Sequence, residues 1–232
     1  MESNHIATKR HAVFTGLFFI AATVTAIIGL ALYKPVLDAA DPLTAAGDQT
    51  SRIAWGALFE CLLAAANCGT AFMMLPVLSR VSRRLGPAYL IFRSLEVVSI
   101  LVGAMSMLTL GTISTSALAQ SSPEIGHALV ALHDWTFVLG PHFMLGVNTF
   151  IYSSLFLRSG LVPRPLSLLG MVGASLIAIV GAVEVLGVIS PYSATTMLMA
   201  IPIAVYEMIL AVRLIAKGFD LTRIPPQSAI AI

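Results

Sequence analysis

Charged side chains are scarce in this chain. They make up 10% of its 232 residues, whereas 58% of the residues are hydrophobic. A soluble domain is about a quarter charged and about half apolar, so the composition argues against a water-soluble globular fold. The shortage is also uneven, because residues 12–33 carry no charged side chain at all. As a helix, a run of that length crosses a hydrocarbon core of roughly 30 Å.

Cysteine and lysine are also rare, and their positions exclude several chemistries. Cys61 and Cys68 fall on one predicted helix, about 10 Å apart, which is too far for a disulfide. We therefore expect two buried free thiols. All three lysines, Lys9, Lys34 and Lys217, lie outside the apolar segments, so a retinal Schiff base is not indicated. No phosphate-binding glycine loop occurs, and no nucleic-acid partner is indicated, because the basic residues border apolar segments and suit the headgroups of membrane lipid.

Six apolar segments predict an all-α fold, a polytopic integral membrane protein built as a six-transmembrane-helix bundle. The strands of a membrane barrel alternate in polarity over about ten residues, whereas these segments are long and apolar all round. The first segment is longer than the apolar region of a typical signal peptide, so we expect a retained span. The whole chain, 1–232, then forms one membrane domain with short tails at 1–11 and 216–232. The predicted spans are about 12–33, 53–78, 87–110, 134–157, 165–190 and 194–215.

Basic residues gather on one side of these spans. Arg93 lies inside a span, and only Lys34 and Arg52 fall on the other side, which carries acidic residues instead. Cytoplasmic loops are the basic ones, so we expect both termini in the cytoplasm, as an even number of spans requires. The residues on the basic side are Lys9, Arg10, Arg80, Arg83, Arg84, Arg158, Arg164, Arg213, Lys217 and Arg223.

Several ionisable residues fall inside the predicted spans. Such residues usually face a bundle interior or a water-filled cavity. Asn67 shares a helical face with Glu60, and Asn148 shares one with Asp134. We therefore expect a polar core and propose its members as binding residues: Glu60, Asn67, Arg93, Glu96, Asp134, Asn148, Glu184 and Glu207.

Two purely structural interpretations of these residues stay open. Arg93 and Glu96 are three apart on one helix and can form a structural ion pair. Glu60, Glu184 and Glu207 can each be protonated and hydrogen-bonded to a neighbouring helix. Five acids against one arginine nevertheless leave a deficit of positive charge, which a proton, a metal ion or a cationic solute would supply.

The stretch HDWTFVLGPHF, residues 133–143, places two histidines and an aspartate in an apolar setting. Trp135 favours the membrane interface, so we expect His133 and Asp134 at the outer rim. Pro141 removes a backbone hydrogen bond and is expected to kink the helix, with His142 just beyond the kink. Imidazole nitrogens are zinc ligands, which makes His133 and His142 candidate metal ligands. No H-E-x-x-H pattern supports that hypothesis.

Three classes of function remain open. The first, which the buried charges favour, is binding or moving a small solute, proton or cation; a carrier of six spans would be small unless it forms a homo-oligomer. The second is a non-catalytic membrane sensor or accessory protein. The third is an intramembrane metal-dependent enzyme, which the spacing of the ligands does not favour. No cofactor is indicated.

Several stretches resemble a known family. They are GLFFIAATVTAIIGLAL, FRSLEVVSILVGAMSML, HDWTFVLGP, RSGLVPRPLSLLGMVG and YEMILAVRLIAKGF, in this order along nearly the whole chain. Together they resemble the bacterial membrane family known as domain of unknown function 4386 (DUF4386). The resemblance implies a multi-pass protein of the bacterial plasma (inner) membrane and implies no activity. It matches Arg93 and Glu96 to an Arg-x-x-Glu motif, Asp134 to a His-Asp pair, and Glu207 to a glutamate of the last span.

Overall fold

The computed structural model of the protein describes residues 2–116, 124–220 and 222. Within these residues every regular element is a helix and no strand occurs. Part of the predicted connection between the third and fourth apolar segments, residues 117–123, and most of the C-terminal tail lie outside the described residues. The elements are α1 (Glu2–Leu37), α2 (Pro42–Asp48), α3 (Thr50–Val81), α4 (Leu85–Ser114), α5 (Glu124–Phe137), the π-helix η2 (Val138–Met144), α6 (Leu145–Ser159), α7 (Arg164–Val185) and α8 (Ala194–Lys217).

Five helices are long and apolar enough to cross a membrane. They are residues 9–37 of α1 together with α3, α4, α7 and α8, and they correspond to five of the six predicted segments. The predicted segment 134–157 instead falls across α5, η2 and α6, which follow one another without a break in the helical trace. The chain is therefore an all-helical membrane protein with at least these five candidate spans.

The π-helix replaces the simple kink expected at Pro141. Proline has no backbone N–H, so the regular helical bonding pattern is interrupted at this position. The chain widens locally, and the N–H of Leu145 bonds to the carbonyl of Gly140, five residues earlier. Single π-turns of this kind often occur at functional sites. Here the wide turn carries His142 on its inner, buried face.

Two element boundaries differ from the prediction. The connection after the first segment contains the short helix α2, because Asp41 caps it by accepting bonds from the N–H groups of Leu43 and Thr44 at 3.1 and 3.2 Å. The fifth segment was predicted to reach residue 190, but α7 ends at Val185. Gly187 follows in the left-handed conformation, with φ of 72°, which ends the helical trace.

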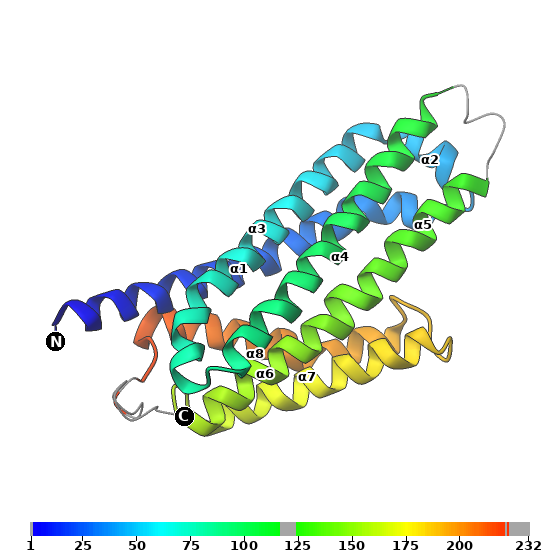
Figure 1. Cartoon of the computed structure of the whole chain (residues 1–232). Coiled ribbons are helices and arrows are strands. Elements are labelled where there is room, and N and C mark those ends of the chain that lie inside the picture. Colours follow the sequence, from blue (N-terminus) through cyan, green and yellow to red (C-terminus); the bar gives the residue numbers. More distant parts are fainter. Residues whose placement is uncertain (1, 117–123, 221, 223–232) are drawn as a thin grey trace.

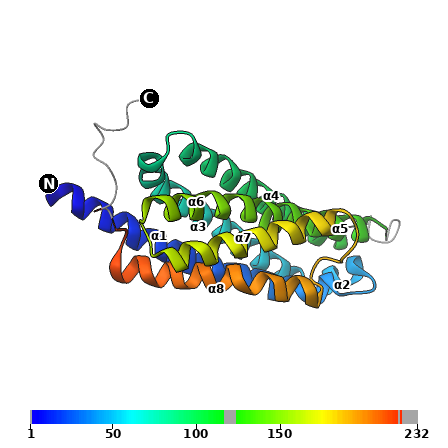
Figure 2. The same ribbon diagram turned by 90° about the horizontal axis from the view of Figure 1, so that it is seen from below.

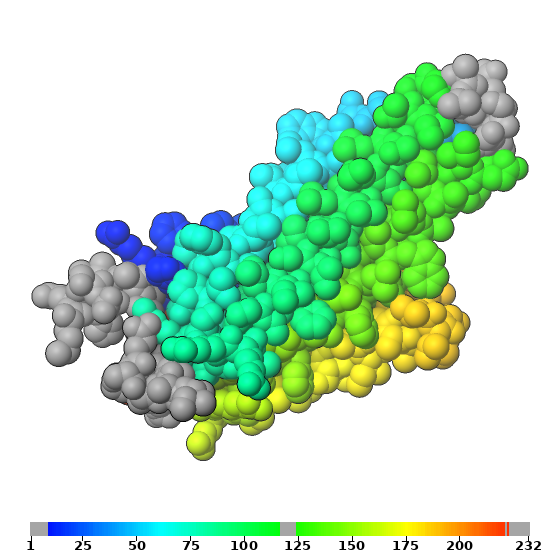
Figure 3. Space-filling view, in the orientation of Figure 1, coloured from blue at the N-terminus to red at the C-terminus, as the bar shows by residue number. Residues whose placement is uncertain are grey.

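The helices form an elongated up-and-down bundle (Figure 1). The start of α1, the α3–α4 and α6–α7 connections, and the end of α8 gather at one end of this bundle, seen from two sides in Figures 1 and 2. That end holds the basic residues predicted to share one side, apart from Arg223, which lies outside the described residues. We call it the basic end. α2 and the α7–α8 loop lie at the opposite end. Figure 3 shows α4 between α3 and α5 on one face of the bundle.

Close helix packing depends on small residues. A Cβ at Gly146 of α6 would lie 2.7 Å from the Cβ of Ala178 and 2.8 Å from the carbonyl oxygen of Ala174, both on α7. The backbones of α6 and α7 therefore approach closely, as small-residue stripes permit in membranes. The prediction of buried cysteines is wrong: Cys61 and Cys68 are both free thiols but exposed on α3. In an apolar span, the outward face is as hydrophobic as the inward one, so composition alone does not orient a thiol.

Candidate functional site

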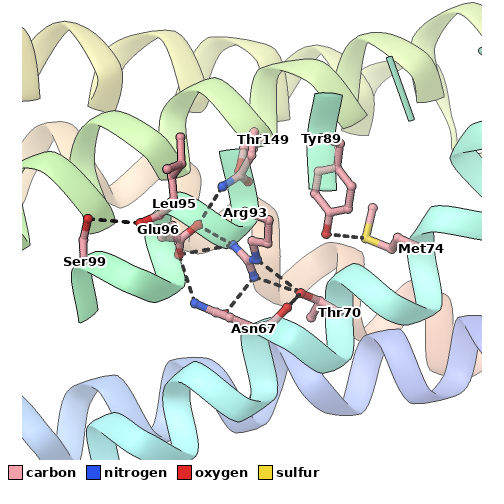
Figure 4. A network of polar contacts seen from close by, with 10 residues as sticks. Asn67, Thr70, Met74, Tyr89, Arg93, Leu95, Glu96, Ser99 and Thr149 are labelled. Atoms are coloured by element: carbon pink, nitrogen blue, oxygen red, sulfur yellow. Dashed lines mark hydrogen bonds and ion pairs between the residues drawn. The ribbon is translucent and has the colours of Figure 1, made fainter. Parts of the chain in front are cut away.

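An ion pair at the centre of the bundle joins three helices. Arg93 and Glu96 of α4 are 2% and 3% exposed, and the guanidinium Nη1 lies 3.0 Å from Glu96 Oε2. Asn67 of α3 donates a hydrogen bond to Glu96 Oε1 at 3.0 Å. Asn148 of α6 donates to Glu96 Oε2 at 2.6 Å. The predicted residues Asn67, Arg93, Glu96 and Asn148 thus form one network, although the sequence had associated Asn148 with Asp134 instead. Figure 4 labels Asn67, Arg93 and Glu96 in this network.

The guanidinium of Arg93 is fully engaged within this network. Its Nε and Nη2 both donate to Thr70 Oγ1, at 3.2 and 3.1 Å, and Nη2 also donates to Asn67 Oδ1 at 2.8 Å. Nη1 donates to both oxygens of Glu96. Every N–H of the group therefore has an acceptor. Arg93 and Glu96 neutralise each other, which leaves the other acids without this arginine as a close partner.

A cavity of about 350 Å³ lies beside the network. Its polar lining includes Glu60, Asn67, Arg93, Glu96 and Glu207, together with His133 and His142. The remaining wall is mostly apolar and comes from α1, α3, α4, α5, η2, α6, α7 and α8. Pockets for small ligands typically measure about 300–1,000 Å³ and have apolar walls with a few convergent polar groups. The cavity meets both criteria.

Glu207 of α8 differs from the other acids of the bundle. It lines the cavity, but within the described part of the chain no side chain forms a hydrogen bond or ion pair with it. The side chain of Phe19, a residue of α1, reaches the network, and the centre of its ring lies 5.9 Å from the guanidinium carbon of Arg93. Glu207 is therefore the cavity carboxyl that lacks a close protein partner.

Glu60 and His133 line the cavity farther from the basic end. His133 Nε2 lies 3.7 Å from Glu60 Oε1, and Tyr33 donates a long hydrogen bond of 3.4 Å to Glu60 Oε2. His133 is 2% exposed and so lies inside the bundle, while its depth at the outer rim of the membrane stays a prediction. His133 lies against α4, where a Cβ at Gly103 would be 3.5 Å from its ring, and its ring packs against Tyr33 with the ring centroids 5.4 Å apart. Asp134 is the outer neighbour, with Oδ1 at 3.5 Å from His133 Nδ1, and does not line the cavity.

Glu184 belongs to a separate buried cluster. His142 Nδ1 lies 2.7 Å from Glu184 Oε2, and Thr196 donates to Glu184 Oε1 at 2.8 Å. Glu184 is absent from the cavity lining, while His142 reaches it. Both oxygens of this carboxyl group thus have partners. Nearby, in the loop after α7, the ring of Tyr192 packs against Phe137, and burial raises the pKa of the Tyr192 hydroxyl because it favours the neutral phenol.

The two candidate metal ligands contact different acids. His133 lies beside Glu60 and Asp134, and His142 lies beside Glu184. Among the residues that the structure describes, no group of three or more His, Cys, Asp or Glu side chains is arranged to hold a metal ion. The structure therefore offers no geometric support for a shared site, and metal binding at His133 and His142 stays a prediction.

Sequence reasoning missed Thr70, Tyr33 and Thr196, each of which hydrogen-bonds an ionisable group. One signal was available for Thr70, which lies three residues after Asn67 and so shares its helical face. Tyr33 and Thr196 stand at the ends of apolar segments, where hydroxyl-bearing residues are common. Nothing in the chain distinguishes them from interfacial residues.

Comparison with known protein families supports the resemblance drawn from the sequence. Residues 14–218 match the family described as "Domain of unknown function (DUF4386)". The match covers most of the chain, so the chain belongs to this family. No curated protein and no solved structure gave a significant match.

Proposed function

We propose that this membrane protein binds a small, positively charged solute in the central cavity, with Glu207 as its principal counter-ion and Glu60 as a second one. The observation that carries the proposal is the unequal pairing of the acids. Arg93, the cavity's arginine, is saturated by Glu96, Asn67 and Thr70, whereas Glu207 has no close partner among the described residues.

Physical chemistry favours a cationic ligand at such a site. An ionised carboxylate is costly in an apolar environment unless a positive group pairs with it. A proton satisfies Glu207 when the cavity is empty, but a proton alone does not need a space of about 350 Å³. An organic cation meets both the charge and the volume, so it is the preferred ligand class over an inorganic ion.

The same proposal assigns a topology. α5, η2 and α6 together form the sixth crossing, since their helical trace is continuous from Glu124 to Ser159. The basic end is the cytoplasmic end, because basic residues favour that side, and both termini then lie there. The host membrane is the bacterial plasma membrane, as the family resemblance implies. The cavity and Glu60 then lie toward the outer half of the bundle.

Closure at the basic end supports a role beyond static binding. A buried cluster that includes Phe19, Tyr152, Tyr206 and Leu210 fills the bundle between the cavity and that end. Moving a solute across the membrane would require this cluster to open in a second conformation. This conformation therefore supports binding of a solute. Transport is a further part of the proposal and requires the second conformation.

Binding of organic cations to the purified protein tests the proposal. Isothermal titration calorimetry in mild detergent is run with a series from tetramethylammonium to tetraphenylphosphonium. We expect at least one cation to bind, and Glu207→Gln to raise its Kd at least about tenfold, the equivalent of about 1.4 kcal/mol. Glu124→Gln, an exposed acid at the start of α5, is the matched control and should bind as the parent does. Absence of binding across the series, or equal binding by Glu207→Gln, would refute the proposal.

A further inference from the structure

We propose that the cavity receives its ligand from the lipid bilayer, through an opening between α1 and α8, and that the ligand is an amphiphilic cation. This inference rests on the proposed cation site and adds the route of entry and the ligand class. The route follows from how α1 and α8 separate along their lengths.

Near the basic end, α1 and α8 are in tight contact. A Cβ at Gly16 of α1 would lie 2.6 Å from the carbonyl oxygen of Ala211 and 2.7 Å from the side chain of Ile215, both on α8. Phe19 belongs to the same buried cluster as Ala211 and Leu210. The two helices therefore seal the bundle at this end.

Farther along, the two helices pack against different neighbours. α1 follows α3: a Cβ at Gly29 would meet Glu60 at 3.4 Å, and the ring of Tyr33 packs over Gly56. α8 follows α7: a Cβ at Gly173 would lie 2.8 Å from the backbone nitrogen of Ile203. Figure 1 shows the resulting divergence, with α1 running toward α2 while α8 runs alongside α7.

The facing edges of the diverging helices line the cavity. On α1 these are Thr23, Ala26, Ile27 and Leu30, and on α8 they are Ala200, Ile203, Ala204 and Glu207. Ile27 is 64% exposed and Ala204 is exposed, so the edges reach the outer surface of the bundle. In a membrane, the space between two spanning helices faces acyl chains rather than water.

The chemistry of this opening selects its ligand. Apart from Glu207, the edges of this opening carry no ionisable side chain, and Ala26, Ala200 and Ala204 contribute only small side chains to them. A strongly hydrated ion does not enter from hydrocarbon, because it would lose its water without compensation. An amphiphilic cation partitions into the bilayer and places its apolar body against Leu63, Ile100 and Ile177 of the cavity wall. Its charged group then reaches Glu207.

An obstruction placed at the opening tests the route. The protein is reconstituted in phospholipid nanodiscs, and binding of radiolabelled tetraphenylphosphonium is followed by rapid filtration. We expect Ala204→Phe to slow association at least tenfold. Leu198→Phe lies on the same helix at a position that is 63% exposed and outside the cavity lining, and should change the rate less than twofold. Tetramethylammonium, which does not partition into lipid, should bind at least tenfold more weakly than tetraphenylphosphonium.

A second variant guards against misfolding of Ala204→Phe. In a Cys61→Ser/Cys68→Ser background, Ala204→Cys is alkylated with N-phenylmaleimide after purification, so that the obstruction is added to folded protein. Leu198→Cys is the control. An unchanged association rate in both obstructed proteins would overturn the lateral route, as would equal affinity for the two cations. If Glu207→Gln still raised the Kd at least tenfold in that case, the cation site would stand without the route. Absence of binding by either cation would overturn both proposals.

Discussion

The side-chain amide of Asn148 donates a 2.6 Å hydrogen bond to Glu96 Oε2 and so ties α6 to α4. Asn67 binds the other oxygen of the same carboxylate from α3. Glu96 therefore holds three helices together. The Arg93–Glu96 pair therefore has a structural role beside the cavity. Glu207, which lines the same cavity, forms no hydrogen bond or ion pair with a described side chain.

Removing the charge of Glu96 should destabilise the protein. Glu96→Gln leaves the buried guanidinium of Arg93 without an anion, and breaking a buried pair in this way costs about 3–5 kcal/mol. We expect a clear drop in the melting temperature, measured in detergent by circular dichroism. Glu124→Gln should melt like the parent, because Glu124 is exposed. Equal melting of the two variants would contradict the role of Glu96 as a joint.

Gly170 should tolerate no side chain. A Cβ there would collide with the ring of Tyr206 and lie 2.5 Å from Ser153 Oγ, whose hydroxyl bonds Tyr206 at 2.8 Å. Because an aromatic ring cannot yield locally, Gly170→Ala should cost about 1–3 kcal/mol in thermal unfolding. The control is Gly111→Ala, where the nearest side-chain atom lies at 3.5 Å. It should melt at or above the parent temperature, and a loss as large as that of Gly170→Ala would rule out the steric explanation.

Stability at the capped end of α2 should depend on acidic pH. Hydrogen bonds from the hydroxyl and backbone N–H of Thr44 lower the pKa of Asp41 below its ordinary value of 3.8. A carboxyl whose pKa is lowered by folding stabilises the fold above its ordinary pKa, and this contribution is lost as the pH falls through the folded value. The melting advantage of the parent over Asp41→Ala should therefore be full at neutral pH and shrink as the pH falls below 3.8 and through the lowered pKa. Asp41→Asn caps without titrating, so its advantage should not fall with pH; a parallel loss in this variant would point to another group.

Elemental analysis tests the remaining metal hypothesis. His133 and His142 bind different carboxylates, so we expect less than about 0.1 transition-metal ion per chain in untagged protein purified without chelator. A His133→Ala/His142→Ala variant should give the same value. About one metal ion per chain that is lost in the variant would instead favour the intramembrane metal-dependent enzyme over the other two classes of function.

Reporter fusions test the orientation. A reporter active only outside the cytoplasm should give no signal when fused after Lys217, at the basic end, and a strong signal when fused after Asp48, at the end of α2. The reason is the concentration of arginine and lysine at the basic end. The reverse pattern would invert the bundle, and signals of equal strength would refute the odd number of crossings, five, proposed between Asp48 and Lys217.

The amino-acid sequence by itself determined the membrane class, the five long spans and the family. These properties are local, because hydropathy accumulates along the chain and the family match extends over residues 14–218. The sequence also identified the ionisable residues that the bundle must accommodate, since charge inside an apolar segment stands out without any structure.

Only the tertiary structure decided which of these residues meet. Partner choice depends on how each helix is rotated about its axis, and contacts such as Gly146 against Ala178 fix that rotation through steric fit between distant segments. The rotation turns Cys61 outward, against expectation, and turns His133 into the bundle. The Arg93–Glu96 pair is local to α4 and was predictable from the sequence, but only the packing of α3 and α6 against α4 adds Asn67 and Asn148 to it and leaves Glu207 facing the cavity.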